Sequence, residues 1–404
     1  MPQKFDRRLE SDYKRVGTCS FSWTGATLTP VTRRTAIFAS VAAAAVVRSR
    51  AGDAVRIGQV AALTGGNAQS GHFLVNGAKL AVQTVNAAGG VLGKPLELIT
   101  EDDQTTNPGA ILAFNRLASR GDIVAFLGPA SSTQTRAIAP DLVRVGAPMI
   151  IVGSDPALTH MGNPWVFRCR AHDGYSARVM AEFGIKELGK QRWAIIHSTD
   201  AFGSAAMKRL LEELDAGGVK PLLVEGYTNQ TLDFTPVVLA VKQSGAEVIG
   251  TYFTFPTDVA AFARQLRQLG VTASWIGSQA IATPTALNLA GAALFDTFGL
   301  TDFHPDANPE AAAFSTRYEQ TYNTPADFYA MIHFDGITVL AHAINAAGST
   351  DPEAVRNALL NTRELKVVTG TLNFDANGDG MRGVNIVRND HGRLVFIKRL
   401  DFTE

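Results

Sequence analysis

The sequence contains little cysteine. Its 404 residues include two, Cys19 and Cys169, so the chain beyond the N-terminal segment has no partner for an internal disulfide. A CxxC redox pair and a zinc knuckle are excluded for the same reason. We expect Cys169, in the mainly apolar run 165–169, to be a small buried side chain rather than a reactive thiol.

Clustered positive charge is absent after the first 51 residues. These carry nine Lys or Arg against three Asp or Glu, although the whole chain has 37 of each kind. The remainder is net acidic, which argues against nucleic acid as a partner, because its binders need a basic face. Hydrophobic residues make up 46% of the chain, enough for large cores, and this length predicts about two or three domains.

The motifs of several enzyme classes are also missing. GxxxxGK[ST] does not occur, no GxGxxG joins a predicted strand to a predicted helix, no HExxH or GxSxG occurs, and the eight histidines lack ligand spacing. We predict no cofactor and no metal. Residues 375–380 copy the first six positions of a calcium loop, but Ile386 stands where the twelfth should be Glu. A tight turn with an Asn-Gly pair is the preferred interpretation, and a calcium site the alternative.

An apolar run near the N-terminus has the form of an export signal. Arg33 and Arg34 precede twelve largely apolar residues, 36–47, too few for a membrane-spanning helix, which needs about 20. The pattern predicts a twin-arginine signal, export to the periplasm and cleavage near Ala51. Residues 1–30 are either an extension or lie upstream of a true start near Val31. No cysteine follows the run, which argues against a lipid anchor.

From residue 55 the chain alternates short apolar runs with helical patterns, the signature of βαβ units and parallel sheets. Strands are predicted at 55–60, 96–100, 123–127, 148–152, 193–197, 221–225, 247–253, 274–277, 296–300, 371–374, 384–388 and 394–400. Helices are predicted at 72–87, 108–118, 133–145, 176–188, 204–216, 234–244, 257–269, 310–322, 326–347 and 352–360.

This order predicts an α/β fold of two doubly wound lobes. The boundaries are 54–172 plus 303–383 for the first lobe and 173–302 plus 384–404 for the second, after an export region at 1–51. The last three helices have no sheet of their own and are expected to pack on the first lobe. The chain would then cross between lobes more than once, as in a hinge.

The run Ser131-Ser-Thr133 follows a predicted strand and leads into a predicted helix. Hydroxyl groups and free backbone amides at a helix N-terminus can bind a carboxylate. Plain helix capping by Ser or Thr is the competing interpretation.

Taken together, several stretches resemble the periplasmic leucine/isoleucine/valine-type binding proteins. They are Ala61-Ala-Leu-Thr-Gly65, Asn76-Gly-Ala-Lys-Leu-Ala-Val82, Val85-Asn-Ala-Ala-Gly-Gly90, Glu101-Asp-Asp-Gln104, Leu127-Gly-Pro129, Ala147-Pro-Met-Ile150, Asn163-Pro-Trp-Val-Phe-Arg168 and Gly348-Ser-Thr-Asp-Pro-Glu-Ala-Val355. The resemblance runs from about residue 55 to the C-terminus. It implies the type I periplasmic binding fold, with a ligand held between the lobes.

The resemblance also implies a ligand site. In the first lobe, Ser131, the backbone of Val152 and the hydroxyl of Ser154 would meet a ligand carboxylate. In the second, Phe202 and Phe255 would wall the pocket.

Two positions depart from the family pattern. Gln279 stands where amino-acid binders of the family carry a carboxylate for the α-ammonium, and Ser70 replaces a bulkier pocket residue. Because an amide cannot neutralise an ammonium, a carboxylic acid or amide without that group is a candidate ligand. Asp200 and Asp258 are either substitute counter-ions or helix caps.

The implied function is a solute receptor, not an enzyme, that delivers an amino acid or related small carboxylate or amide to an ABC importer. Its partners would be the ligand and the permease, with the chain itself a monomer. Two alternatives stay open: a ligand sensor on the same fold, and a serine hydrolase that uses Ser131 as nucleophile.

Overall fold

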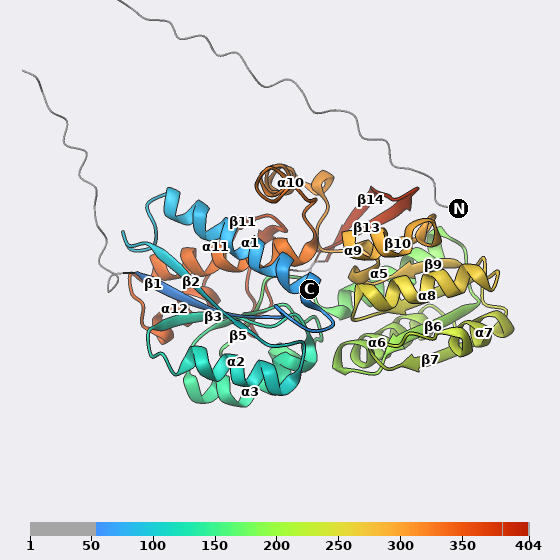
Figure 1. The fold of residues 1–404 in the computed structure, drawn as a ribbon, viewed down its shortest axis with the longest axis horizontal. Coiled ribbons are helices and arrows are strands. Elements are labelled where there is room, and N and C mark those ends of the chain that lie inside the picture. The colour runs from blue at the N-terminus through green and yellow to red at the C-terminus, as the bar shows by residue number, and fades with distance from the viewer. Residues whose placement is uncertain (1–53, 382, 403–404) are drawn as a thin grey trace, which may run out of the picture. The chain divides into compact units, whose positions relative to one another are not determined.

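The computed structural model of the chain describes residues 54–381 and 383–402. In that part, two large sheets form the cores of two α/β lobes (Figure 1). The first sheet is parallel throughout, in the order β2-β1-β3-β4-β5. Its strands are β1 (Val55–Ala61), β2 (Leu96–Asp102), β3 (Ile123–Leu127), β4 (Met149–Ile151) and β5 (Val166–Arg168).

The second sheet has the order β14-β13-β10-β9-β8-β6-β7. Five neighbouring strands run parallel, and β13 and β14 close one edge as an antiparallel hairpin. The strands are β6 (Trp193–Ser198), β7 (Leu223–Tyr227), β8 (Val248–Tyr252), β9 (Ser274–Gly277), β10 (Phe298–Thr301), β13 (Gly383–Asp390) and β14 (Arg393–Asp401). A small separate ladder joins β11 (Leu365–Val367) to β12 (Gly370–Leu372).

Helices cover both faces of each sheet. They are α1 (Ala68–Ala87), α2 (Asn107–Ala118), α3 (Ser132–Val145), α4 (Ala157–His160), α5 (Asp173–Glu182), α6 (Ala201–Ala216), α7 (Thr235–Ser244), α8 (Pro256–Gln268), α9 (Pro284–Ala290), α10 (Pro309–Tyr322), α11 (Phe328–Ala347) and α12 (Pro352–Leu360). Alternate side chains of β6 show why both faces need a cover. Trp193 and Ile195 pack with α5 and α6, whereas Ala194 and Ile196 pack with α7 and α8.

The three C-terminal helices pack on the first lobe, as the sequence predicts. Buried residues of α11 and α12 share one core with Val55 and Ile57 of β1, and α10 packs with Phe73 of α1. The backbones of α1 and α11 approach so closely that a Cβ at Gly77 would lie 1.8 Å from the carbonyl oxygen of Ala330. Only glycine fits there.

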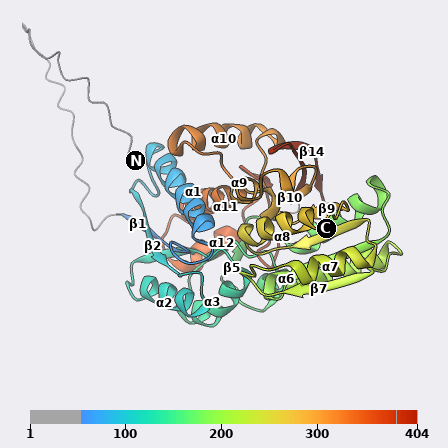
Figure 2. The same ribbon diagram turned by 45° about the vertical axis from the view of Figure 1, so that its right-hand side comes forward.

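The chain passes between the lobes three times, after β5, after β10 and before β13. Figure 2 shows the first lobe on the left and the second on the right. The fold class predicted from the sequence is thereby confirmed. Residues 1–53, which hold the predicted export signal, lie outside the described part of the chain.

Some elements differ from the sequence predictions. The helix predicted at 176–188 begins at Asp173 and becomes π-helical over Phe183–Glu187. Strand β5 and helix α9 were not predicted, because three residues ending in Arg168 and seven residues in α9 are too short for a clear period. Residues 375–380 form the expected turn, in which Asp375 Oδ1 accepts from the amides of Asn377 and Asp379.

Candidate functional site

A small cavity of about 30 Å³ lies between the two lobes. The segments that line it include those that follow the carboxyl ends of β3, β4, β8 and β9, where ligands bind in open α/β sheets. The lining residues come from both lobes and from the first crossing: Ala130, Ser131, Ser132, Val152, Gly153, Ser154, Arg170, Phe202, Phe253, Thr254, Gln279, Ala280, Phe328 and Tyr329. A solute could enter only if the lobes separate, because about 30 Å³ holds no more than a few water molecules.

Ser131 both caps α3 and lines this cavity. Its hydroxyl oxygen accepts from the backbone amide of Gln134 at 3.2 Å, so the capping interpretation is confirmed. The other free amides of the first turn form the positive end of the helix dipole. The ligand role of Ser131 stays a prediction, and the geometry allows both roles at once.

The two other residues predicted in the first lobe also line the cavity. Ser154 donates its hydroxyl proton to Asp173 Oδ2 at 2.8 Å, and the carbonyl of Val152 accepts from Arg170 Nη1 at 3.0 Å. Burial raises the pKa of Asp173 to about 6, although the charge of Arg170 and the Ser154 bond act in the opposite direction. The hydroxyl oxygen of Ser154 can still accept a hydrogen bond from a donor group of a ligand.

On the second lobe, Phe202 and Gln279 line the cavity, and their contact with a ligand stays a prediction. Phe202 stands edge-on to the ring of Tyr252, with centroids 6.0 Å apart. Gln279 begins a 3₁₀ turn, Gln279–Ala282, directly after β9 and is 4% exposed. Among the described residues that line the cavity, none is Asp or Glu.

The structure does not place Phe255 or Ser70 in the lining. Phe255 is the residue before α8, and Phe253 and Thr254 face the cavity instead. Ser70 is buried in α1 and bonds to the side chain of Tyr329, which does line the cavity. Ser70 can therefore influence the site through Tyr329. The ligand-binding roles of Phe255 and Ser70 remain predictions.

Asp200 and Asp258 are engaged outside the cavity. Asp200 caps α6 by accepting from the amide of Gly203 at 2.9 Å. Its carboxylate also accepts from Ser198, Asn229 and Thr254. Asp258 accepts from the amide of Gln230 at 3.0 Å, and burial raises its pKa to about 6. Neither carboxylate lines the cavity to offer a charge to a ligand ammonium.

Arg170 is a cavity residue that the sequence analysis missed. It lies just after β5 in the first crossing, is 4% exposed, and pairs with Asp302 in the second crossing at 2.6 Å. Its guanidinium lies over the ring of Phe328, 5.5 Å from the centroid. One pattern in the sequence could have indicated Arg170. Arg168 and Arg170 flank Cys169, which is buried, so two cations lie beside a hydrophobic core.

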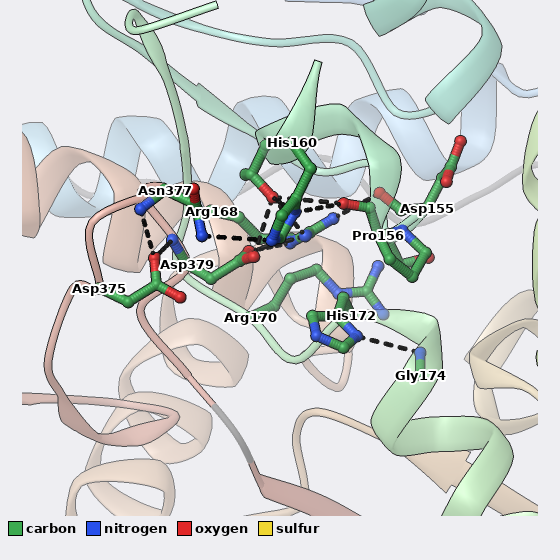
Figure 3. A network of polar contacts seen from close by, with 12 residues as sticks. Asp155, Pro156, His160, Arg168, Arg170, His172, Gly174, Asp375, Asn377 and Asp379 are labelled. Carbon is green, nitrogen blue, oxygen red and sulfur yellow. Dashed lines mark hydrogen bonds and ion pairs between the residues drawn. The ribbon is translucent and has the colours of Figure 1, made fainter. Parts of the chain in front are cut away.

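Arg168, the last residue of β5, joins the first sheet to the third crossing. Its Nε donates to Asp379 at 2.7 Å and its Nη1 donates to the carbonyl of Asp155 at 2.9 Å (Figure 3). Thr159 also bonds to Asp379. The carboxylate of Asp379, within the calcium-loop-like residues 375–380, thus accepts hydrogen bonds from protein donors. The described residues contain no group of three or more His, Cys, Asp or Glu placed for a metal.

The lobes touch beside the cavity. The amide of Ala201, at the start of α6, donates to the hydroxyl of Thr133 in α3 at 3.1 Å. Gly66 lies against the side chain of Gln230. A Cβ atom added at Gly66 would lie 2.9 Å from Cδ of Gln230. These contacts describe a conformation in which the lobes have come together around the cavity.

Two α/β lobes, three crossings and a cavity between the lobes are the architecture of a solute-binding protein. A family model described as "Periplasmic binding protein" matches residues 54–393. The chain belongs to this periplasmic binding protein family, which is a family of solute-binding proteins. In the described residues, no helix is both long and apolar enough to cross a membrane.

Individual relatives agree with the family. An amino acid binding protein from Pseudomonas aeruginosa is 29% identical over 80% of this chain and 87% of its own length. A Leu/Ile/Val-binding protein homologue from Brucella melitensis is 28% identical over 89% of this chain and 98% of its own. The crystal structure of a leucine-binding protein from Thermotoga maritima has the same fold, with a TM-score of 0.80 and 24% identity over 86% and 99% of the two chains.

Proposed function

We propose that this chain is the extracytoplasmic receptor of an ABC importer, which closes on a small amino acid, carboxylate or amide and presents it to a permease as a monomer. The observation that carries the proposal is the cavity between the lobes, with Ser131, Val152 and Ser154 on one side and Phe202 and Gln279 on the other. The relatives named above support a small amino acid-like ligand.

Binding without catalysis is part of the proposal. A hydrolase that uses Ser131 would need a histidine close to its hydroxyl. The described residues that line the cavity include no histidine. His333, buried in α11, bonds instead to Gln59 and to the carbonyl of Gly128. A sensor would use the same lobes and cavity, and no feature of the described residues favours it over a transporter subunit.

A thermal-shift screen of the mature protein tests the binding function. A ligand that binds the native state raises the melting temperature by mass action. We expect stabilisation by at least one member of a panel of amino acids, aromatic acids, short fatty acids and their amides. If the whole panel has no effect and an unrelated small molecule stabilises the protein, the assignment of ligand class is wrong.

Two further parts of the proposal concern the chain's organisation. We place the lobes at 54–172 plus 303–383 and at 173–302 plus 384–404, with a twin-arginine signal at 1–51. Replacement of Arg33 and Arg34 by lysine is expected to leave the precursor in the cytoplasm. Unchanged export of that variant would contradict the signal, and would leave the binding function untouched.

A further inference from the structure

Arg170 and Asp302 form a buried ion pair that is short of hydrogen bonds. Arg170 Nη2 and Asp302 Oδ2 are 2.6 Å apart. Neither Nε nor Nη2 of Arg170, nor either carboxylate oxygen of Asp302, makes an aligned hydrogen bond to another described residue. Nη1 donates to the carbonyl of Val152. A buried ion pair that lacks further partners is poorly compensated for its desolvation.

The two charges are placed differently relative to the cavity. Arg170 lines it, whereas Asp302 does not, so a ligand meets the cation and not its counter-ion. Arg170 is also the sole charged side chain among the described lining residues. A guanidinium with spare donors in a dry site binds a carboxylate strongly, because its planar fork fits two oxygens.

Asp302 would keep part of its compensation if Arg170 turned toward a ligand. The charges of Arg399 and Arg168 also act on Asp302 and oppose the rise in its pKa that burial causes. An α-ammonium group, in contrast, would find Arg170 and the neutral Gln279 in this lining, with no carboxylate. The same site therefore favours an anion and disfavours a zwitterion.

We propose that Arg170 determines specificity by taking the carboxylate of a ligand that has no α-ammonium group, whose apolar or aromatic body packs against Phe202, Phe253 and Phe328. This inference rests on the proposed binding function and narrows its ligand class. Asp302 holds the guanidinium in place when no ligand is bound, and the ligand carboxylate shares or replaces that contact.

Matched probes test whether the site prefers a carboxylate without an α-ammonium group. L-phenylalanine is compared with 3-phenylpropanoate and 3-phenylpropanamide, and L-leucine with 4-methylpentanoate, by calorimetry and thermal shift on the mature protein. We expect at least one carboxylate to bind about tenfold or more tightly than its amino acid and its amide, the gain of a charge-assisted bond. Tighter binding of the amino acid overturns the inference and leaves the proposed function standing. Failure of all five probes overturns the inference, and the wider panel of the thermal-shift screen then decides the proposed function.

A charge-balanced variant tests the residue. Arg170→Met combined with Asp302→Asn removes both charges without leaving either one buried alone. We expect the tightest carboxylate to lose about 10- to 100-fold in affinity, with the amide changed less than about threefold. Carboxylate affinity within threefold of the wild type would show that Arg170 does not hold the ligand.

Two more variants complete the test. Arg170→Lys keeps the charge but loses the fork, and we expect an intermediate loss of about three- to tenfold even if the double variant fails to fold. Arg317→Met, on the exposed face of α10, is the matched control and should bind as the wild type. Equal affinities of Arg170→Lys, the control and the wild type would again overturn the assignment.

Discussion

Arg168 and Asp379 join the end of β5 to the segment before β13, at positions 211 residues apart in the chain. Arg168 is fully buried and Asp379 is 4% exposed, so neither charge has water to compensate for the loss of the other. The backbones meet there as well, because Arg168 and Asp379 form an isolated parallel bridge. The contact fixes the relative position of β5 and the segment that returns to the second sheet.

Loss of this ion pair should destabilise the protein strongly. Asp379→Asn leaves the guanidinium of Arg168 buried without a counter-ion, and we expect a loss of about 3–5 kcal/mol in the free energy of unfolding. Urea titration followed by circular dichroism measures it. Glu212→Gln, which breaks the exposed pair of Glu212 with Arg209, is the control and should cost less than about 0.5 kcal/mol. Similar losses in the two variants would contradict this prediction.

The two roles of Ser131 can be separated by a second helix cap. Ser131→Ala and Thr106→Ala each remove a hydroxyl that caps a helix, α3 and α2 respectively, and each should cost about 1 kcal/mol of stability. Thr106 does not line the cavity. Only Ser131→Ala is therefore expected to weaken ligand binding, by about fivefold, the typical net value of one hydrogen bond. Equal affinities of the two variants would leave Ser131 with its capping role alone.

The hydrogen bond between Thr133 and Ala201 should favour the closed arrangement of the lobes. Thr133→Val keeps the shape of the side chain and removes the acceptor for the Ala201 amide. We expect about a two- to tenfold loss in ligand affinity and little change in the free energy of unfolding, as measured by calorimetry and denaturant titration. Thr321→Val in α10, whose hydroxyl bonds within its own helix, is the control. No difference between them would mean that this contact does not stabilise closure.

His333 should remain neutral well into the acid range. Burial lowers its pKa from 6.5 to about 3, although its bond to the Gly128 carbonyl acts in the opposite direction. Because this pKa lies below the unfolded value, the stabilisation by His333 is complete above about pH 6.5 and is lost as the pH falls toward 3.

The bonds of His333 also predict its tautomer. The Gly128 carbonyl can only accept, so Nε2 carries the proton and Nδ1 accepts from Gln59. Long-range proton–nitrogen spectra between pH 7 and 5 should show this neutral form throughout. A doubly protonated ring at pH 5 would contradict the prediction.

Much of the fold could be predicted because each apolar run carries its own local signal. The strands of both sheets occur within a few residues of the predicted ranges, since a buried parallel strand needs a short continuous apolar segment. Strand β5 escaped prediction because its three residues end in Arg168, whose burial depends on Asp379 far away in the sequence. The π-helical end after α5 likewise has no pattern of its own in the sequence.

The candidate site divides in the same way. Ser131, Val152, Ser154, Phe202 and Gln279 line the cavity. The family resemblance implied these residues, and they lie at or after the carboxyl ends of parallel strands, which is where ligands bind in such sheets. Phe255 lies outside the lining, to which Phe253 and Thr254 contribute after β8, and its ligand role stays a prediction.

The sequence alone determined the two lobes and their alternating strands and helices, because these depend on residue type and local order. The lack of an ammonium counter-ion at Gln279 is a prediction from the family resemblance. Only the tertiary structure decided which charges face the cavity. The carboxylate of Asp200 accepts hydrogen bonds from four protein donors. Arg170 lines the cavity and pairs with Asp302. The strength of a charge depends on its burial and on its nearest partners, and these come from segments that meet only when the chain has folded.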